Sequence, residues 1–192
     1  MRRGAGLLLL LLPLAVAPPA AASPALVGAV GGTAAITGGF DQGGASIAVA
    51  VLWPVEGLPL RFGVMGHGDD LGTRLAAIRD RHDGSPRGTV ATGHRAVWGA
   101  SWRLDAGLPV RAGLEPGVSA SWGYYWVADD AQGGDVAAAS SAGFSLAVDL
   151  ARQLGPSHAA GIVVRYHRLF NDLAGRYITG AVEWRWGGPA AR

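Results

Sequence analysis

A two-residue alternation of apolar and non-apolar side chains runs without a break from Val110 to Trp126. One parity is apolar throughout and carries Trp122, Tyr124 and Trp126, whereas the other holds mainly Gly, Ser and charged residues. Successive side chains of a β-strand point to opposite faces of the sheet. The stretch therefore predicts a strand with one continuous apolar face.

The same alternation recurs along the chain and predicts eight strands, at residues 25–37, 45–53, 60–67, 95–104, 110–126, 143–150, 160–167 and 176–186. The second face of these strands is dominated by Gly, Ala and Ser with scattered charges. A water-soluble sandwich would carry longer polar side chains on its outer face. Small residues with a few charges suit a narrow interior better, which favours a barrel with its apolar face outward.

Six tryptophans on the apolar parity lie toward strand ends, where membrane barrels place aromatic side chains at the lipid interface. These are Trp53, Trp102, Trp122, Trp126, Trp184 and Trp186. The pattern predicts an all-β, eight-stranded antiparallel transmembrane β-barrel in which the last strand pairs with the first. The alternative is a secreted soluble β-barrel or sandwich that acts as a binding protein.

Short connections alternate with longer, more polar ones, as in outer-membrane barrels, whose short turns face the periplasm. The phrase Gly-Leu-Pro marks two of the short turns, at residues 57–59 and 107–109, and each is followed by an Arg, at 61 and 111. Gly and Pro supply turn dihedrals. We expect both turns to lead into strands whose Arg points into the lumen.

Residues 1–23 have the pattern of a secretory signal peptide, with Arg2 and Arg3 before a leucine-rich run and small residues near Ala22. Its removal reduces the sixteen basic residues to fourteen, equal to the fourteen acidic ones, so nucleic acid is not expected as a partner. The chain has no Cys, which excludes disulfides and thiolate metal sites. The remaining chain divides into a barrel at residues 25–187 and a short tail at 188–192.

The chain resembles the small eight-stranded outer-membrane barrels of the OmpA/OmpX type over nearly all of residues 25–187. Its final strand, YITGAVEWRW at 177–186, is similar to the carboxy-terminal signal that the family's precursors present for assembly. That family usually ends on the aromatic residue itself, whereas this chain continues beyond Trp186. The resemblance implies location in the cell outer membrane after export, with outer-membrane lipid, including lipopolysaccharide, and the barrel-assembly machinery as partners.

The charges on the inner parity are expected to form an ion-pair network that fills the lumen, because eight strands enclose space only for side chains. Buried charges need partners of opposite sign. The predicted network comprises Arg61, Arg95, Arg103, Arg111, Glu115, Asp149, Arg165, Glu183 and Arg185. A proton or ion path through these residues is a more specific alternative, but no motif in the sequence supports it.

One stretch, RYHRLFND at 165–172, is similar in degraded form to a segment of the lipid A deacylase family of barrels. In that family a His and a Ser two residues later precede an Asn. Here the Asn position matches Asn171, the Ser position holds Phe170, and the His position holds Arg168, with His167 one place away. Acyl transfer needs an activated hydroxyl or thiol. An acyl hydrolase would therefore need a Ser from another strand, such as Ser121, beside a His at the outer leaflet.

Two polar clusters in the longest connection, HGDD at 67–70 and RDRHD at 79–83, contain residue types that bind divalent ions. Loops collect such residues by default, so no metal site is predicted. Leu71, Leu75 and Ile78 have helical spacing and suggest a short helix within 71–83. The overall prediction is a monomeric, non-enzymatic outer-membrane barrel without a cofactor, which acts structurally or through its outer loops.

Overall fold

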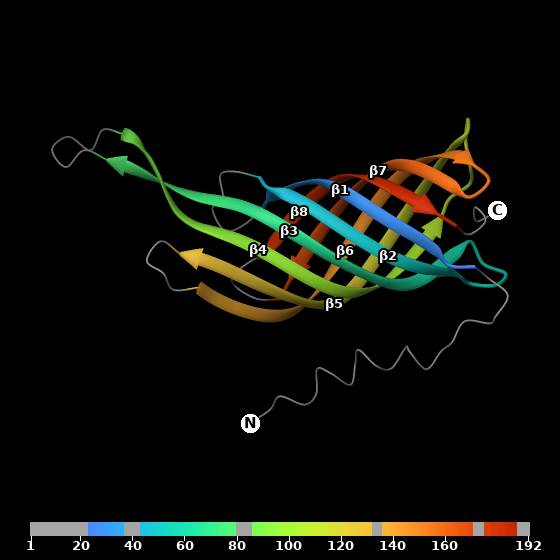
Figure 1. Cartoon of the computed structure of the whole chain (residues 1–192), viewed down its shortest axis with the longest axis horizontal. Helices are drawn as coiled ribbons and strands as arrows, with labels where there is room; N and C mark the ends of the chain where they lie inside the picture. Colours follow the sequence, from blue (N-terminus) through green and yellow to red (C-terminus); the bar gives the residue numbers. More distant parts are fainter. Residues whose placement is uncertain (1–22, 37–42, 80–85, 132–135, 171–174, 188–192) are drawn as a thin grey trace, which may run out of the picture.

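The computed structural model describes residues 23–36, 43–79, 86–131, 136–170 and 175–187. They form a closed barrel of eight antiparallel strands (Figure 1). The strands are β1 (Ala25–Ala35), β2 (Ala45–Pro54), β3 (Leu60–Arg79), β4 (Pro86–Gly107), β5 (Leu114–Ala131), β6 (Val136–Gly155), β7 (His158–Leu169) and β8 (Arg176–Trp186). The predicted fold and the pairing of β8 with β1 are confirmed. No helix among the described residues is long and apolar enough to cross a membrane.

The apolar parity of the strands faces outward, as expected for the inside-out arrangement. Val148 of β6 and Val182 of β8 are 60% and 59% exposed, whereas their sequence neighbours Ala147 and Glu183 are buried in the lumen. The six tryptophans predicted at the lipid interface all lie on this outward face, half-buried or exposed. A soluble barrel would expose polar side chains there instead, so this surface is suited to hydrocarbon.

The two ends of the barrel differ in their connections. One end of the barrel, called the turn end, has three short connections. Residues 55–59 join β2 to β3, residues 108–113 join β4 to β5, and residues 156–157 join β6 to β7. The opposite end, called the loop end, is where β3 ends and β4 begins and where β5 ends and β6 begins. Ala112 and Gly113 both have positive φ, and Arg111 and Leu114 exchange two backbone hydrogen bonds around them. This is a two-residue hairpin of the type that such dihedrals favour.

The hairpin at Ala112 and Gly113 corrects one prediction about the lumen. Alternation continues through this segment, which is why a strand was expected from Val110, but β5 begins only at Leu114. Arg111 is therefore exposed at the turn end and does not enter the lumen. Arg61, after the matching Gly-Leu-Pro turn, is half-buried on the inward parity of β3.

Strands β3 and β4 extend as a hairpin well beyond the other strands at the loop end (Figure 1). The short helix expected within 71–83 is wrong for residues 71–79, which pair with β4 across three register shifts. The alternation fades here because a hairpin beyond the barrel wall has no lipid face and no lumen face to separate. The remainder of that segment lies outside the described residues, as do the predicted signal peptide, apart from Ser23, and the predicted tail.

A charge placed on the outward face tests whether that face contacts hydrocarbon. Val148 pairs with Val164 near the middle of β7, so Val148→Arg would put a guanidinium near the bilayer midplane. We expect a loss of about 2–4 kcal/mol in the free energy of unfolding in lipid vesicles. The matched control is Leu154→Arg, because Leu154 is exposed on the same strand near the turn end. This variant should lower the free energy of unfolding by at most about 1 kcal/mol. Equal and small effects in both variants would contradict a lipid-facing surface.

Candidate functional site in the barrel lumen

The described lumen contains two polar groups at different depths. An ion-pair network lies toward the turn end, and a cluster formed by His67, Asp69 and His167 lies toward the loop end. Both come from the inward parity of their strands, which is the parity that the alternation assigned to the interior. The two groups differ in charge and in how completely their polar atoms are satisfied.

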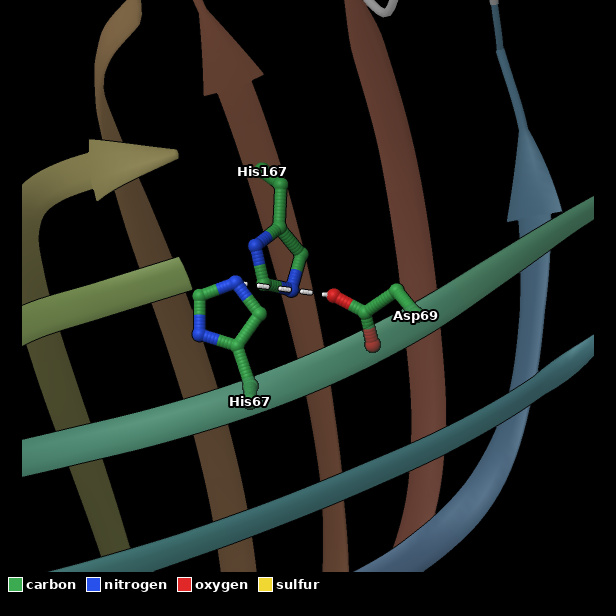
Figure 2. A group of neighbouring side chains, drawn as sticks. All are labelled: His67, Asp69 and His167. Atoms are coloured by element: carbon green, nitrogen blue, oxygen red, sulfur yellow. Dashed lines mark ion pairs between the residues drawn. The ribbon is translucent and has the colours of Figure 1, made fainter. Parts of the chain in front are cut away.

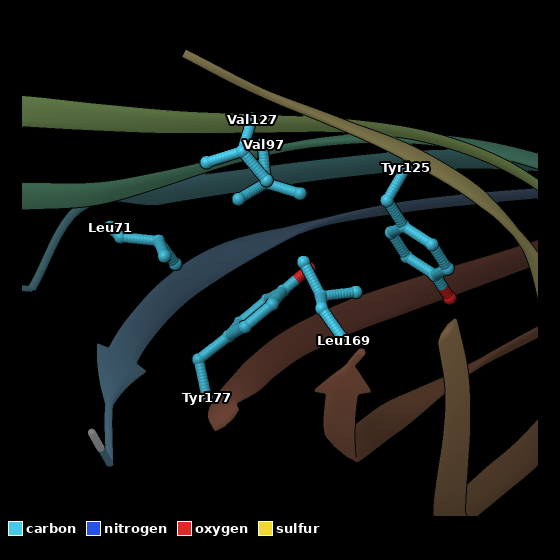
Figure 3. Packing of buried hydrophobic residues seen from close by; sticks show 6 residues of the cluster. All are labelled: Leu71, Val97, Tyr125, Val127, Leu169 and Tyr177. Carbon is cyan, nitrogen blue, oxygen red and sulfur yellow. The ribbon is translucent and has the colours of Figure 1, made fainter. Parts of the chain in front are cut away.

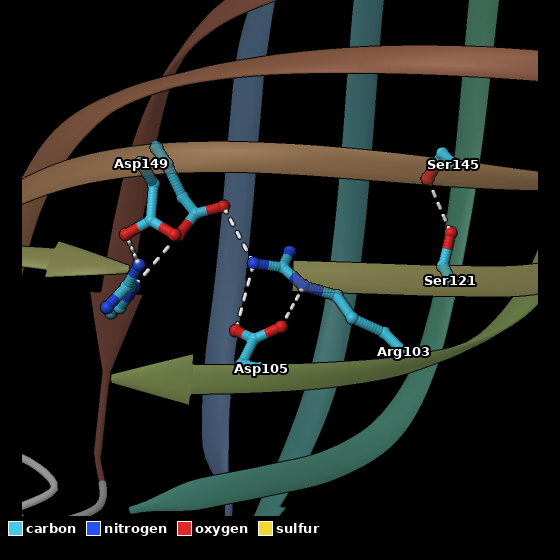
Figure 4. A network of polar contacts seen from close by, with 7 residues as sticks. Arg103, Asp105, Ser121, Ser145 and Asp149 are labelled. Carbon is cyan, nitrogen blue, oxygen red and sulfur yellow. Dashed lines mark hydrogen bonds and ion pairs between the residues drawn. The ribbon is translucent and has the colours of Figure 1, made fainter. Parts of the chain in front are cut away.

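Arg103 is the centre of the ion-pair network (Figure 4). Its guanidinium donates two hydrogen bonds to Asp105, at 2.6 and 3.0 Å, and a third to Glu183 across the barrel at 3.2 Å. Arg103 and Glu183 are each 2% exposed. A bidentate Arg–carboxylate contact is the geometry in which a buried charge pair best offsets its desolvation.

Arg185 continues the network around the lumen. It donates to Glu183 at 2.8 Å and to Asp149 at 2.5 Å, so Glu183 links the two arginines. Gly117 makes room for this contact, because a Cβ atom there would lie 2.7 Å from the Asp149 carboxylate. These contacts join β4, β6 and β8 from the inside.

The other predicted lumen residues occupy different surroundings. Arg95 meets Asp129 at 2.5 Å, closer to the loop end. Arg61 and Glu115 line a small, open pocket at the turn end, together with Asp149 and Arg185. Arg165 is 4% exposed, and its Nη2 atom has no hydrogen-bond partner.

Sequence reasoning missed two acidic partners in this lumen, Asp105 and Asp129. Both continue the inward parity of a predicted strand, Asp105 just after residue 104 and Asp129 just after residue 126. Carrying the alternation past the predicted strand ends would have found both. The arginines were recognised because they interrupt runs of small residues.

The histidine cluster brings together residues from two strands far apart in the sequence (Figure 2). His67 and Asp69 lie on β3, and His167 lies on β7. The His67 Nε2 and Asp69 Oδ2 atoms are 3.6 Å apart, and the two imidazole centroids are 5.4 Å apart. The sequence placed HGDD at the start of a loop, but β3 carries His67 and Asp69 into the interior.

Hydroxyl groups hold the Asp69 carboxylate in place. Ser46 donates to Oδ1 at 2.6 Å, and Tyr177 donates to Oδ2 at 2.8 Å. The Tyr177 ring also stacks on His167, with centroids 4.3 Å apart and planes 6° from parallel. Gly99 leaves the space that His67 fills, since a Cβ atom there would lie 2.2 Å from the imidazole Cε1.

An apolar cluster, drawn in Figure 3, contacts the histidines through the rings of Tyr125 and Tyr177. It is formed by Leu71, Val97, Tyr125, Val127, Leu169 and Tyr177, all of which are buried. The Tyr125 ring packs against His67 at a centroid distance of 5.1 Å. Burial among apolar side chains keeps water away from the histidines and strengthens electrostatic contacts among them.

In the described part of the lumen, His167 is not paired with a serine as an acyl hydrolase would require. His167 is 1% exposed inside the barrel rather than at a lipid-facing rim, and its Nε2 atom contacts Thr179 Oγ1 at 3.4 Å. Ser145, its register neighbour on β6, is hydrogen-bonded to Ser121 at 2.6 Å. Among the described residues, no serine is hydrogen-bonded to a histidine. Asn171 lies outside the described residues.

Removing the charge that links both arginines tests the ion-pair network. Glu183→Gln leaves Arg103 and Arg185 with one carboxylate each, and we expect a loss of about 2–3 kcal/mol in the free energy of unfolding. Glu56→Gln is the control, because Glu56 is exposed in the β2–β3 turn and should change stability by no more than about 0.5 kcal/mol. Equilibrium urea unfolding in vesicles measures both. A Glu183 variant as stable as the control would show that the network contributes little.

Comparison with known proteins identifies the fold. No family model and no curated protein matches the sequence. Among solved structures, Neisserial surface protein A has a TM-score of 0.61 at 12% identity, covering 85% of this chain and 96% of its own. The N-terminal β-barrel domain of Pseudomonas aeruginosa OprF has a TM-score of 0.54 at 9% identity, covering 85% and 97%.

A third solved structure, a major outer membrane protein from Thermus thermophilus, has a TM-score of 0.50 at 12% identity, covering 85% of this chain and 99% of its own. At such low sequence identity, the structural similarity shows a shared fold and nothing more specific. Together with the closed eight-stranded topology and the outward apolar face, this similarity shows that this chain has the fold of the small outer-membrane β-barrels.

Proposed function

We propose that the protein is a small, non-enzymatic outer-membrane barrel, exported by means of a cleaved signal peptide at residues 1–23. The observation that carries this proposal is the distribution of polarity. The outward face is apolar, while the inward face holds buried ion pairs such as Arg103 with Glu183. A chain with this arrangement is stable where its outside meets lipid and its inside does not.

The role within the membrane is structural or surface-interactive, through the loop end. Two neighbouring hairpins, β3–β4 and β5–β6, have the longest strands of the barrel and continue toward the loop end beyond β1, β7 and β8 (Figure 1). Segments that project past the membrane are available to contact other molecules. The proposed partners within the envelope are outer-membrane lipid, including lipopolysaccharide, and the barrel-assembly machinery, and the barrel acts as a monomer.

Transport is a weaker explanation for this lumen. Glu183 accepts hydrogen bonds of 3.2 Å from Arg103 and 2.8 Å from Arg185 inside the lumen. Passage of a solute would have to break these contacts. Separating buried charges costs several kcal/mol, because each arginine would lose one of its two carboxylate partners and Glu183 would lose both of its arginines. A filled lumen is therefore better suited to a rigid anchor for the outer hairpins than to a channel.

Fractionation tests the proposed location directly. In the native host, we expect the protein in the outer-membrane fraction, migrating differently on a gel before and after boiling, because a closed barrel resists denaturation by detergent. An engineered soluble β-protein passed through the same export route serves as the control. Recovery from the soluble periplasmic or extracellular fraction would contradict the proposal.

A separate assay tests the absence of acyl hydrolase activity. The refolded barrel is incubated with lipid A, and we expect no loss of an acyl chain by mass spectrometry, because His167 faces the lumen without a serine partner. A lipid A deacylase assayed in parallel establishes that the substrate is competent. Deacylation that disappears in His167→Ala would overturn the non-enzymatic assignment.

A further inference from the structure

The histidine cluster has a property that a structural or surface role does not require. We propose that His67, Asp69 and His167 bind one divalent transition-metal ion inside the lumen, and we take zinc as the ion that tests this site. This inference goes beyond the proposed function, since a barrel can anchor surface hairpins with or without a metal. It rests on the ligand types, on their unsatisfied atoms and on the groups that surround them.

The ligand set suits zinc. Two imidazoles and one carboxylate offer one ligand atom each, and these three atoms all lie within 4.8 Å of one another. Zinc binds imidazole nitrogen and carboxylate oxygen at about 2.0–2.2 Å in tetrahedral geometry, so movements of roughly 1 Å at the side-chain ends would close the site. Calcium and magnesium prefer sites made of oxygen atoms alone, and thiolate-selective ions find no Cys here.

Unpartnered nitrogens point to a missing ligand. Both ring nitrogens of His67 and the Nδ1 atom of His167 are buried without a hydrogen-bond partner. The two residues are 6% and 1% exposed, so bulk solvent does not reach these atoms. Buried polar atoms are almost always paired, and a group left unpaired calls for an explanation. Coordination of a metal by the two rings, which lie next to each other in Figure 2 with their planes tilted by 48°, supplies one.

Asp69 differs from the other buried acids of the lumen. Asp105, Asp149 and Glu183 each meet an arginine within 3.2 Å. Asp69 is instead held by the hydroxyls of Ser46 and Tyr177, with His67 Nε2 at 3.6 Å. Hydrogen bonds from hydroxyls orient a carboxylate while leaving it free to bind a cation.

Tyr177 organises two of the three ligands. Its hydroxyl donates to Asp69 at 2.8 Å while its ring stacks on His167. Such outer contacts fix the orientation of metal ligands and contribute strongly to affinity. Ser46 and Tyr177 thus act as positioning residues rather than as ligands.

Arg165 is the positive charge that faces the cluster, two residues before His167 on the same face of β7. It interacts electrostatically with His67, Asp69 and His167, and also with Asp105 and Glu183. If Asp69 binds a metal together with the two neutral imidazoles, the charge of Arg165 would be balanced by Asp105 and Glu183. With two neutral imidazoles and one carboxylate, the metal site would carry a net charge of +1 beside this arginine, and its fourth tetrahedral position would be filled by water or an anion.

The test uses the full-length mature barrel, free of any tag, refolded in detergent without metal. Zinc is added, the protein is separated from free ion by gel filtration, and bound zinc is measured by elemental mass spectrometry. Cobalt serves as a second probe, because its visible absorption reports coordination geometry. We expect one zinc per chain and a cobalt spectrum of tetrahedral type with imidazole ligands.

Variants assign the bound ion to the cluster. His67→Gln, Asp69→Asn and His167→Gln should each reduce bound zinc to background, while heat-modifiable migration confirms that each variant is folded. Ser46→Ala keeps all three ligands and should weaken zinc binding by about 10–100-fold, as expected for loss of an outer contact. This milder variant keeps the proposal testable if a ligand variant fails to fold.

The matched control removes every histidine outside the cluster. The chain has five histidines, so the combined variant His82→Gln, His94→Gln and His158→Gln leaves only His67 and His167. His94 is the important member, because it contacts Asp70 at 3.0 Å on the exposed side of the barrel and could bind zinc superficially. The control should retain one zinc per chain. Absence of bound zinc in the parent protein, or its loss in the control, would overturn the proposal.

Discussion

Each strand of this barrel pairs with a neighbour on both sides, so the ladder of backbone hydrogen bonds is closed. Lipid offers no partner for an N–H or C=O group, so a membrane-spanning sheet must leave no open edge. Here β8 pairs with β1 from Leu26 opposite Trp186 to Ala35 opposite Tyr177, which removes the last edge. Once the sheet is closed, each strand has one face toward the outside and one toward a narrow interior. Every later feature of the molecule follows from this division.

The interior that results is small, and its polar residues are arranged by depth. Near the turn end, Arg103 and Arg185 share Glu183, so charges compensate one another across the barrel. Toward the loop end, Asp69 is satisfied by hydroxyls, and the neighbouring imidazoles have unpartnered nitrogens. The first group is complete in itself, whereas the second has the coordination chemistry of a site that takes an ion. Both are compatible with a barrel whose outer face contacts lipid.

The sequence predicted the fold well because the two faces of each spanning strand meet different surroundings, and the alternation records that difference. It failed where the difference disappears. The β3–β4 hairpin extends past the barrel, so its residues carry no regular pattern and were read as a loop with a helix. Arg111 was misplaced because alternation continues through the turn at Ala112, whose positive φ no pattern of polarity reveals. The His67–His167 contact was also beyond prediction, since it depends on the relative stagger of β3 and β7, which do not pair with each other.

The glycines of the lumen wall have an evolutionary consequence. Gly99 provides the space that His67 occupies, and Gly117 does the same for Asp149, so in each pair a missing side chain on one strand matches a large one on another. Neither member can change alone without a clash or a void. Related chains should therefore vary at such positions in pairs, exchanging which strand carries the bulk while the summed volume stays constant. Some of the 31 glycines of this chain would then be present because a large lumen side chain on a neighbouring strand occupies the space beside them.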